Sequence, residues 1–316
     1  MKNDRNKIGI KVQHIEINEN NDGQRLDNFL LTLLKGVPKS RIYRMVRKGE
    51  VRINKKRCEV RSRLSAGDIV RIPPVRMTES NSEIFIPTFL RRSLEKSILF
   101  EDDALMIINK PSGFAVHGGS GIESGIIEGL RAIRPEQHFL ELVHRLDRDT
   151  SGCLLIAKKR SPLKKLHELF RDNGVEKSYL ALLSGQWQRK KMRVDAPLLK
   201  NVTQGGERMV IVSKAGKTAE TFFKRIQSYR DATLVEAMPK TGRTHQIRVH
   251  AAWLGHPIIG DERYGNDIIN RFFKKQGLNR LFLHAQSLSF NHPVTEKKLS
   301  ITAPLPQDLE KTLSGI

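Results

Sequence analysis

The sequence has 316 residues, enough for a large globular core and one smaller module. Its 56 Lys and Arg against 34 Asp and Glu give a formal net charge of +22, which favours a polyanion as partner, nucleic acid before an anionic membrane. No apolar run approaches a membrane span, no basic amphipathic helix or lipidation motif is present, and Cys58 and Cys153 alone make neither a disulfide framework nor a zinc set. We therefore expect a cytoplasmic protein without a membrane partner.

The first part of the chain predicts a small module with a strong positive charge. Residues 1–22 are interpreted as an N-terminal tail and residues 23–75 as the module; fourteen Lys or Arg lie between residues 35 and 76, against three acids. Apolar residues at helical spacing predict one helix, and a cap at Ser40 with a stop at Gly49 predicts a second. The expected helices and short strands cover residues 26–34, 41–48, 51–53, 57–60 and 69–72.

The second of these helices would carry its charge on one side. Arg41, Arg44 and Lys48 are three and four residues apart, so they share a face. A solvated face without a partner is the alternative, but the ordering of the basic residues favours RNA phosphates. Several spaced motifs then resemble an S4 RNA-binding domain: Arg25-Leu26-Asp27, Ser40-Arg41, GEVRIN at 49–54 and Gly67-Asp68-Ile69-Val70.

The remainder of the chain predicts a linker followed by a large mixed domain. Residues 76–96 have a polar, proline-containing composition without clear periodicity, which is typical of a linker. Residues 97–316 alternate apolar runs and turns, which indicates α+β structure with a mostly antiparallel sheet. Strands are expected over residues 104–109, 153–157, 178–183, 217–227, 233–237, 281–290 and 298–302. Helices are expected from Ser161 to 173 and from a Thr244 cap to 253.

One stretch of this domain, LVHRLDRDTSG at 142–152, has the features of a reactive site. Asp147 lies between Arg145 and Arg148 and before a turn. Nearby positive charge favours an ionised carboxylate, which is a poor general acid but can serve as nucleophile, base or electrostatic stabiliser. Local chemistry alone favours a purely structural aspartate that caps the turn.

A family resemblance reverses that balance. HRLDRDTSG is similar to the signature of the RluA-type pseudouridine synthases, and within that family the chain most resembles the RluC branch, which modifies several uridines of large-subunit (23S) ribosomal RNA. The supporting motifs occur in the same order along the chain: Asn109-Lys110-Pro111 with Gly113, AVHGGSG at 115–121, KSYLA at 177–181, APLLKN at 196–201, GRTHQIRVH at 242–250 and NRLFLHA at 279–285.

The resemblance implies a pseudouridine synthase fold and a role for four residues. Asp147 matches the catalytic aspartate, and Arg248 matches the basic residue that pairs with it. Tyr179 matches the tyrosine whose ring packs against the target base. Arg145 matches the arginine that fills the space left by the extracted base, while the RNA-binding role of the S4-like module falls to Arg41, Arg44 and Lys48.

No metal or other cofactor is expected, and we expect a monomer. His245 and His250 are five residues apart, so on a helix they would not share a face, and no helix-opening GxGxxG motif occurs. Three alternatives stay open. The chain could belong to another branch that acts on different rRNA or tRNA uridines, or be a non-enzymatic S4-type RNA-binding or ribosome assembly factor. It could also be a glycosidic hydrolase, which would ordinarily need a second carboxylate.

Overall fold

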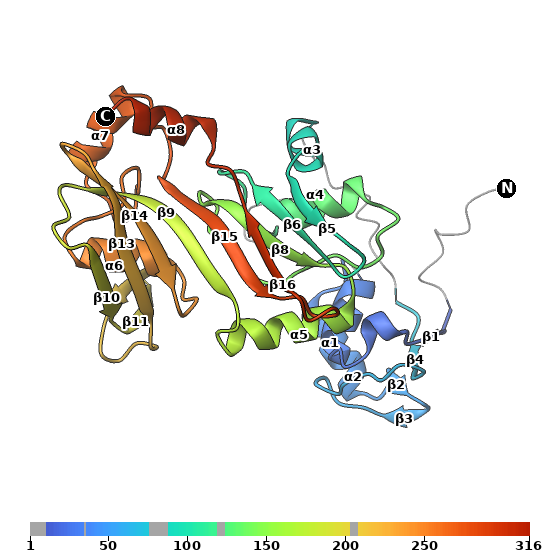
Figure 1. The fold of residues 1–316 in the computed structure, drawn as a ribbon. Helices are drawn as coiled ribbons and strands as arrows, with labels where there is room; N and C mark the ends of the chain where they lie inside the picture. Colours follow the sequence, from blue (N-terminus) through green and yellow to red (C-terminus); the bar gives the residue numbers. More distant parts are fainter. Residues whose placement is uncertain (1–10, 35, 76–87, 119–123, 203–207) are drawn as a thin grey trace. The chain divides into compact units, whose positions relative to one another are not determined.

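The computed structural model describes residues 11–34, 36–75, 88–118, 124–202 and 208–316 (Figure 1). The chain divides into an N-terminal unit, residues 1–83, and a C-terminal unit, residues 84–316. Within the described ranges, no helix combines the length and the apolar character that crossing a membrane requires.

The N-terminal unit packs two helices and a four-stranded antiparallel sheet around one apolar core. Leu26 and Leu30 of the first helix, Ile42 of the second, and Val70 and Ile72 of the last strand are buried together there. The elements are β1 (Gln13–Glu16), α1 (Leu26–Leu33), α2 (Lys39–Arg47), β2 (Arg52–Ile53), β3 (Lys56–Arg57) and β4 (Ile69–Ile72), and the strand order is β1-β4-β2-β3.

Two predictions for this unit need correction. Residues 13–16 of the predicted tail form β1, which pairs antiparallel with β4. Four residues are too few to reveal a strand in the sequence, because the apolar contacts that stabilise β1 come from the rest of the sheet. Ser40 does not cap α2; it lies inside the first turn, and Pro38 stands at the cap position without a side-chain bond. Gly49 does end the helix, with a φ of 72° that suits glycine.

The predicted linker is also partly helical. Residues 76–87 lie outside the described part of the chain, but α3 (Thr88–Glu95) occupies the second half of the predicted stretch. Leu90 and Leu94, one helical turn apart, are buried in a core of the C-terminal unit. Two turns of helix show too few apolar positions for the period to be recognised in the sequence.

The C-terminal unit is built on a ten-stranded sheet with the path β10-β13-β14-β9-β15-β8-β6-β5, on which β16 pairs with β15 and β7 with β8. All pairings are antiparallel except that of β15 with β8. The strands are β5 (Ile98–Glu101), β6 (Leu105–Lys110), β7 (Glu141–Leu142), β8 (Ser151–Ala157), β9 (Glu176–Ser184), β10 (Lys191–Asp195), β13 (Glu220–Ser228), β14 (Ala232–Pro239), β15 (Leu283–Asn291) and β16 (Lys298–Thr302), while β11 (Leu198–Val202) and β12 (Arg208–Val212) form a separate hairpin.

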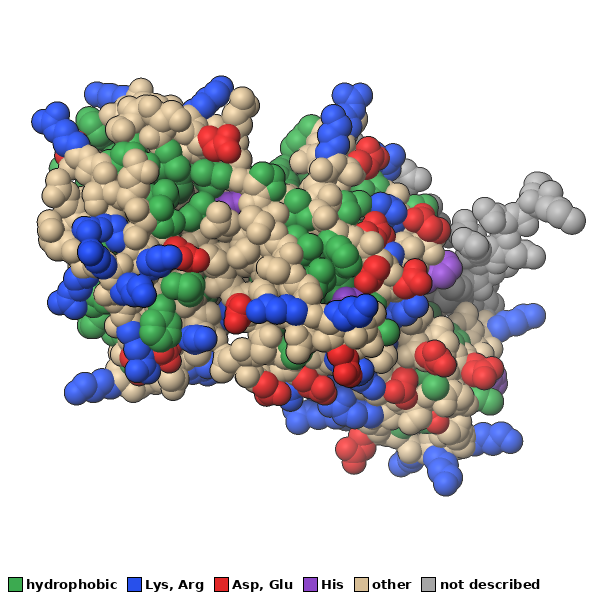
Figure 2. Space-filling view, viewed as in Figure 1, with side chains coloured by type: hydrophobic (Ala, Val, Ile, Leu, Met, Phe, Trp, Pro, Cys, Tyr) green, Lys and Arg blue, Asp and Glu red, His purple; other side chains and the backbone are tan. Residues whose placement is uncertain are grey.

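Helices cover this sheet, and the mixed, mostly antiparallel α+β class is confirmed (Figure 1). They are α4 (Ile126–Ile133), α5 (Arg160–Arg171), α6 (Gln246–Trp253), α7 (Asp267–Lys275) and α8 (Gln307–Ser314). Thr244 is not the cap of α6, because His245 holds that position with a left-handed φ of 53°. Figure 2 shows that Lys and Arg side chains gather over β10 and β13 on the face in view.

Candidate active site

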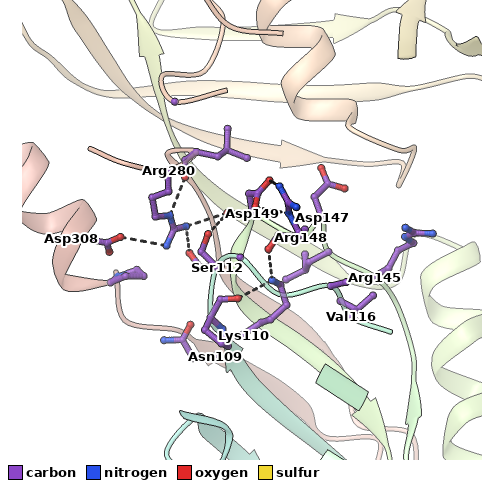
Figure 3. A pocket seen from close by; sticks show the side chains of 18 of the residues that line it. Asn109, Lys110, Ser112, Val116, Arg145, Asp147, Arg148, Asp149, Arg280 and Asp308 are labelled. Carbon is purple, nitrogen blue, oxygen red and sulfur yellow. Dashed lines mark hydrogen bonds and ion pairs between the residues drawn. The ribbon is translucent and has the colours of Figure 1, made fainter. Parts of the chain in front are cut away.

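Asp147 lies in the loop that joins β7 to β8, at the end of the central strands. Its backbone carbonyl accepts a hydrogen bond from the Thr150 N–H at 3.2 Å, which closes a tight turn. Its side chain is 23% exposed and faces a broad, polar groove of the C-terminal unit (Figure 3). The carboxylate is therefore accessible to a ligand although its backbone is fixed.

The positive partner of Asp147 is Arg248 on α6. Arg248 donates from Nη1 to Oδ2 of Asp147 at 3.2 Å, and Oδ1 has no hydrogen-bond partner in the described part of the chain. From Nε and Nη2 the same guanidinium donates to both oxygens of Asp261, at 2.7 and 2.8 Å. One guanidinium thus links two carboxylates, and Asp147 keeps one oxygen for other chemistry.

Asp261 was not predicted from the sequence, and it holds Arg248 in place. Its side chain is fully buried and also accepts from the backbone N–H groups of Arg263 and Tyr264, both at 3.0 Å. Burial disfavours the charged carboxylate, but the hydrogen bonds and charge of Arg248 outweigh burial and hold the pKa of Asp261 below its ordinary value. The ring of Tyr264 lies 5.1 Å from the guanidinium carbon of Arg248 and stacks against it.

Arg248 is correspondingly a permanent cation. Burial opposes its charge, but the hydrogen bonds to Asp261 and the charges of Asp261 and Asp147 keep the pKa of Arg248 above its ordinary value. His245, whose Nε2 lies 3.9 Å from Oδ2 of Asp147, does not share this role. Burial lowers the pKa of His245, so it is neutral at pH 7, and its Nδ1 is hydrogen-bonded to the Tyr264 hydroxyl at 2.9 Å.

Tyr179 stands on β9, in the middle of the sheet. Its cross-strand neighbours are Ala237 and Ala285, and its ring packs against two apolar clusters of the unit. Burial, together with the negative charge of Asp147, raises the pKa of Tyr179, so the phenol stays protonated. The structure thus pairs Asp147 with Arg248, and Tyr179 is near enough for the charge of Asp147 to act on its phenol, although Tyr179 is not among the residues that line the groove.

Lys110, the last residue of β6, holds the loop that carries Asp147 through hydrogen bonds to backbone carbonyls. The Lys110 side chain is fully buried, and its Nζ donates to the backbone carbonyls of Pro111, Phe114 and Arg148 at 2.8 to 2.9 Å (Figure 3). Burial and the nearby charge of Arg280 lower the pKa of Lys110 to about 7. The Ser112 hydroxyl donates to the backbone carbonyl of Asp149 at 2.7 Å, which adds a further link between the loop after β6 and the loop that carries Asp147.

The two arginines that flank Asp147 in the sequence do not hold it. Arg148 pairs with Asp149, with Nε 3.0 Å from Oδ1. The side chains of Arg145 and Asp147 leave the loop in different directions (Figure 3), and the exposed Arg145 lines the groove. The expectation that neighbouring guanidiniums stabilise Asp147 was therefore wrong in its residues, since Arg248 supplies that charge.

The predicted basic face of α2 is present in the N-terminal unit. Arg41, Arg44 and Lys48 are all exposed, and the apolar side chains of the helix are buried on its other side. Among the residues that the structure describes, no three His, Cys, Asp or Glu side chains are grouped so that they could bind a metal ion.

Comparison with known proteins follows the same division. An RNA pseudouridylate synthase family model matches residues 104–253, and an S4 domain model matches residues 24–70. The chain is 56% identical to ribosomal large subunit pseudouridine synthase C of Escherichia coli (strain K12) over 308 residues, 96% of this chain and 97% of that protein. It is 57% identical to the protein of the same name from Yersinia pestis over 307 residues, 96% of each chain.

A solved structure agrees with these relatives. Human RNA Pseudouridylate Synthase Domain Containing 4 is 29% identical, with a TM-score of 0.60, and the match covers 72% of this chain and 95% of that one. Family models, full-length relatives and the fold all point the same way. The chain therefore belongs to the RNA pseudouridylate synthase family and carries an S4 domain before its catalytic unit.

Proposed function

We propose that this protein converts several uridines of large-subunit (23S) ribosomal RNA to pseudouridine, with Asp147 as the catalytic residue. Full-length similarity to ribosomal large subunit pseudouridine synthases supports the substrate. The observation that carries the chemistry is the Asp147 carboxylate, which is open to a groove and held through one oxygen by a buried, doubly bound Arg248.

The reaction breaks the C1′–N1 bond of a uridine, turns the uracil and rejoins it to the ribose through C5. A stacked base is out of reach, so the uridine must first leave the helix, at a cost of a few kcal/mol. Arg145 is exposed on the same loop as Asp147, and its flat guanidinium can fill the vacated place and stack on bases. The ring of Tyr179 then holds the detached uracil beside Asp147.

Recognition of the RNA is assigned to basic side chains outside this site. Arg41 and Arg44 on α2, with Lys48 at its C-terminal cap, contact phosphates, which supply affinity but little sequence information. The protein acts as a monomer in the cytoplasm and needs no metal or small-molecule cofactor, because the isomerisation involves no net redox change and Asp147, Arg248 and Tyr179 supply the groups assigned to it.

The test is to map pseudouridines in ribosomal and transfer RNA from cells with and without the gene. We expect large-subunit sites to disappear and wild-type protein to restore them, while Asp147→Asn does not. In vitro, in buffer with EDTA, Asp147→Asn is expected to slow tritium release from C5-labelled RNA by roughly a thousandfold or more, with little change in RNA affinity.

Asp149→Asn is the matched control. Asp149 is two residues away, and its carboxylate is paired with Arg148 on the surface, so this variant should keep most of its activity. If Asp147→Asn retained a tenth of the wild-type rate, Asp147 would not be the catalytic residue. Loss of transfer RNA sites alone would show that the substrate is wrong.

A further inference from the structure

A row of three arginines and one histidine crosses the whole sheet of the N-terminal unit. His14 on β1 is opposite Arg71 on β4, Arg71 is opposite Arg52 on β2, and Arg52 is opposite Arg57 on β3. Directly opposed residues of antiparallel strands point to the same side of the sheet. These four residues therefore form one cross-strand ladder.

The ladder lies on the outer face of the sheet. Val70 and Ile72, on either side of Arg71, are buried in the core, so Arg71 must point the other way. His14, Arg52 and Arg57 are exposed and Arg71 is half-buried. A shallow hollow on this face is lined by His14, Gly49, Arg52, Asn54, Lys55, Ile69 and Arg71.

The arginines of the ladder are not held by ion pairs in the described part of the unit, although Glu16 on β1, opposite Ile69, shares the outer face with them. Among the described residues, none of these three arginines forms an ion pair with a carboxylate, although like charges directly opposite each other destabilise a sheet. Backbone carbonyls instead fix the guanidiniums: Arg52 donates to Gly49 and Lys55 at 3.2 Å, and Arg71 donates to Glu50 at 2.6 Å. The cations are pre-positioned and keep further N–H donors for a ligand.

We propose that this ladder binds the phosphate backbone of the RNA substrate, as a second contact surface of the S4 domain in addition to the basic face of α2. The inference rests on the proposed function, in that the RNA is the ribosomal substrate. Strands lie roughly 4.8 Å apart, so the four residues span roughly 14 Å. The three arginines among them are planar cations suited to successive phosphates of one strand.

An acidic protein partner fits this surface less well. Protein interfaces have a buried apolar core, and the hollow beside the ladder is lined by a single exposed apolar side chain, Ile69, at 48% exposure. One isoleucine at the edge of a row of cations can contact a sugar or a base, but it gives no apolar core for a protein interface.

The first test uses the unmodified full-length protein. Phenylglyoxal reacts with accessible arginines, and mass spectrometry compares their reactivity with and without an in vitro transcript of large-subunit ribosomal RNA. We expect the RNA to reduce the reactivity of Arg52, Arg57 and Arg71 severalfold, and to leave the exposed Arg61 of the same unit close to its free value. Unchanged reactivity of Arg52 and Arg71 in the complex would overturn the proposal, and would leave an acidic protein as the candidate occupant.

The second test measures how binding depends on salt. Each phosphate contact contributes about 0.7 to 0.9 to the log–log slope, so Arg52→Gln with Arg71→Gln should lower the slope by roughly 1.5. The ratio of the variant Kd to the wild-type Kd should then fall roughly eightfold as salt rises from 50 to 200 mM. Arg52→Lys with Arg71→Lys should keep the slope, because the charges remain.

Arg61→Gln with Arg63→Gln removes the same charge from the same unit away from the ladder. An equal fall in slope for this control would mean that only overall charge matters, and would contradict the proposal. If the variant with Arg52→Gln and Arg71→Gln does not fold, as judged by circular dichroism, the phenylglyoxal experiment on the wild-type protein decides whether the ladder binds RNA. Pseudouridine formation on the same transcript is recorded separately, so that bound RNA without product counts against the proposed activity and not against the ladder.

Discussion

Arg248 is held more firmly by Asp261 than by Asp147. Two hydrogen bonds of 2.7 and 2.8 Å join it to the fully buried Asp261, against one of 3.2 Å to Asp147. We therefore expect Asp261→Asn to loosen Arg248, slow the reaction and lower the free energy of unfolding by about 3 kcal/mol, as when a buried ion pair loses one partner. Single-turnover rates and urea denaturation measure the two effects, with the conservative Asp261→Glu variant expected to recover part of both.

The pH dependence of stability distinguishes this ion pair from simple packing. The folded pKa of Asp261 is lowered by Arg248 despite burial, so its contribution is fully present above the unfolded value of about 3.9 and is lost as pH falls through the folded pKa. The stability difference between wild type and Asp261→Asn should be constant above about pH 5 and shrink below it. A difference that stays constant down to about pH 3 would show that charge is not involved.

Tyr179 and Arg248 should respond differently to substitution. In the described part of the chain the Tyr179 hydroxyl makes no hydrogen bond, so Tyr179→Phe keeps the ring and should be the milder change. Arg248→Ala removes the cation beside Asp147 and should slow single-turnover chemistry by about a hundredfold, with a smaller effect on RNA affinity. Normal chemistry with greatly weakened binding in Arg248→Ala would make Arg248 a phosphate contact instead.

Sequence motifs located three of these side chains but not what surrounds them. Asp147 and Arg248 are 101 positions apart, and only the family resemblance joined them beforehand. Local reasoning chose Arg145 and Arg148 as the cations beside Asp147, whereas Arg148 pairs with Asp149 and Arg145 is exposed in the groove. Asp261 is 13 positions from Arg248, and nothing local marks it, because its role arises from how the segment after α6 folds back on that helix.

Elements were predictable where an apolar run lies between clear turn signals. Buried strands such as β6, β8 and β14 were found in this way. The short amphipathic helices α4, α7 and α8 were missed, as were the edge strand β10 and the hairpin of β11 and β12. In these elements the charged and apolar residues face consistent sides only when the sheet is formed. Tertiary packing therefore determines their secondary structure.

The junction of β8 and β15 offers a test at this scale. Gly152 on β8 has a φ of 109°, and a Cβ there would overlap the backbone of Ala285 on β15, with which it pairs. Gly113 has a φ of 87°, but the space that a Cβ would occupy there has no atom within 4 Å. Gly113→Ala should therefore cost about 1 to 2 kcal/mol, from backbone strain alone.

Gly152→Ala should cost clearly more, above about 3 kcal/mol, because the strands must also separate. The strain is five residues from Asp147, so the single-turnover rate should fall together with the free energy of unfolding measured in urea. Equal losses in the two alanine variants would show that the strand junction tolerates the added methyl group.

In the described parts of the chain, the apolar clusters of the two units share no residue. The apolar cluster of the N-terminal unit lies between Ile15 and Val75, and the clusters of the C-terminal unit begin at Leu90. Each described strand likewise pairs only with strands of its own unit. Composition alone predicted this division into a basic module and a large mixed domain, whereas the positions of β1 and α3 needed the structure.

Removal of residues 1–85 should therefore leave a folded catalytic unit that still contains Asp147, Tyr179 and Arg248. Its affinity for ribosomal RNA should drop, and its salt dependence should become shallower, by roughly 2 for the three α2 contacts at about 0.7 each, and by more if the ladder also binds. A full-length variant with Arg41→Gln, Arg44→Gln and Lys48→Gln is the matched control for the α2 share. Tritium release at saturating RNA should persist in the truncated protein, although site choice can loosen. An unchanged slope would mean that the S4 domain does not contact the RNA backbone, and a folded truncation without activity at any RNA concentration would mean that it helps to build the active site.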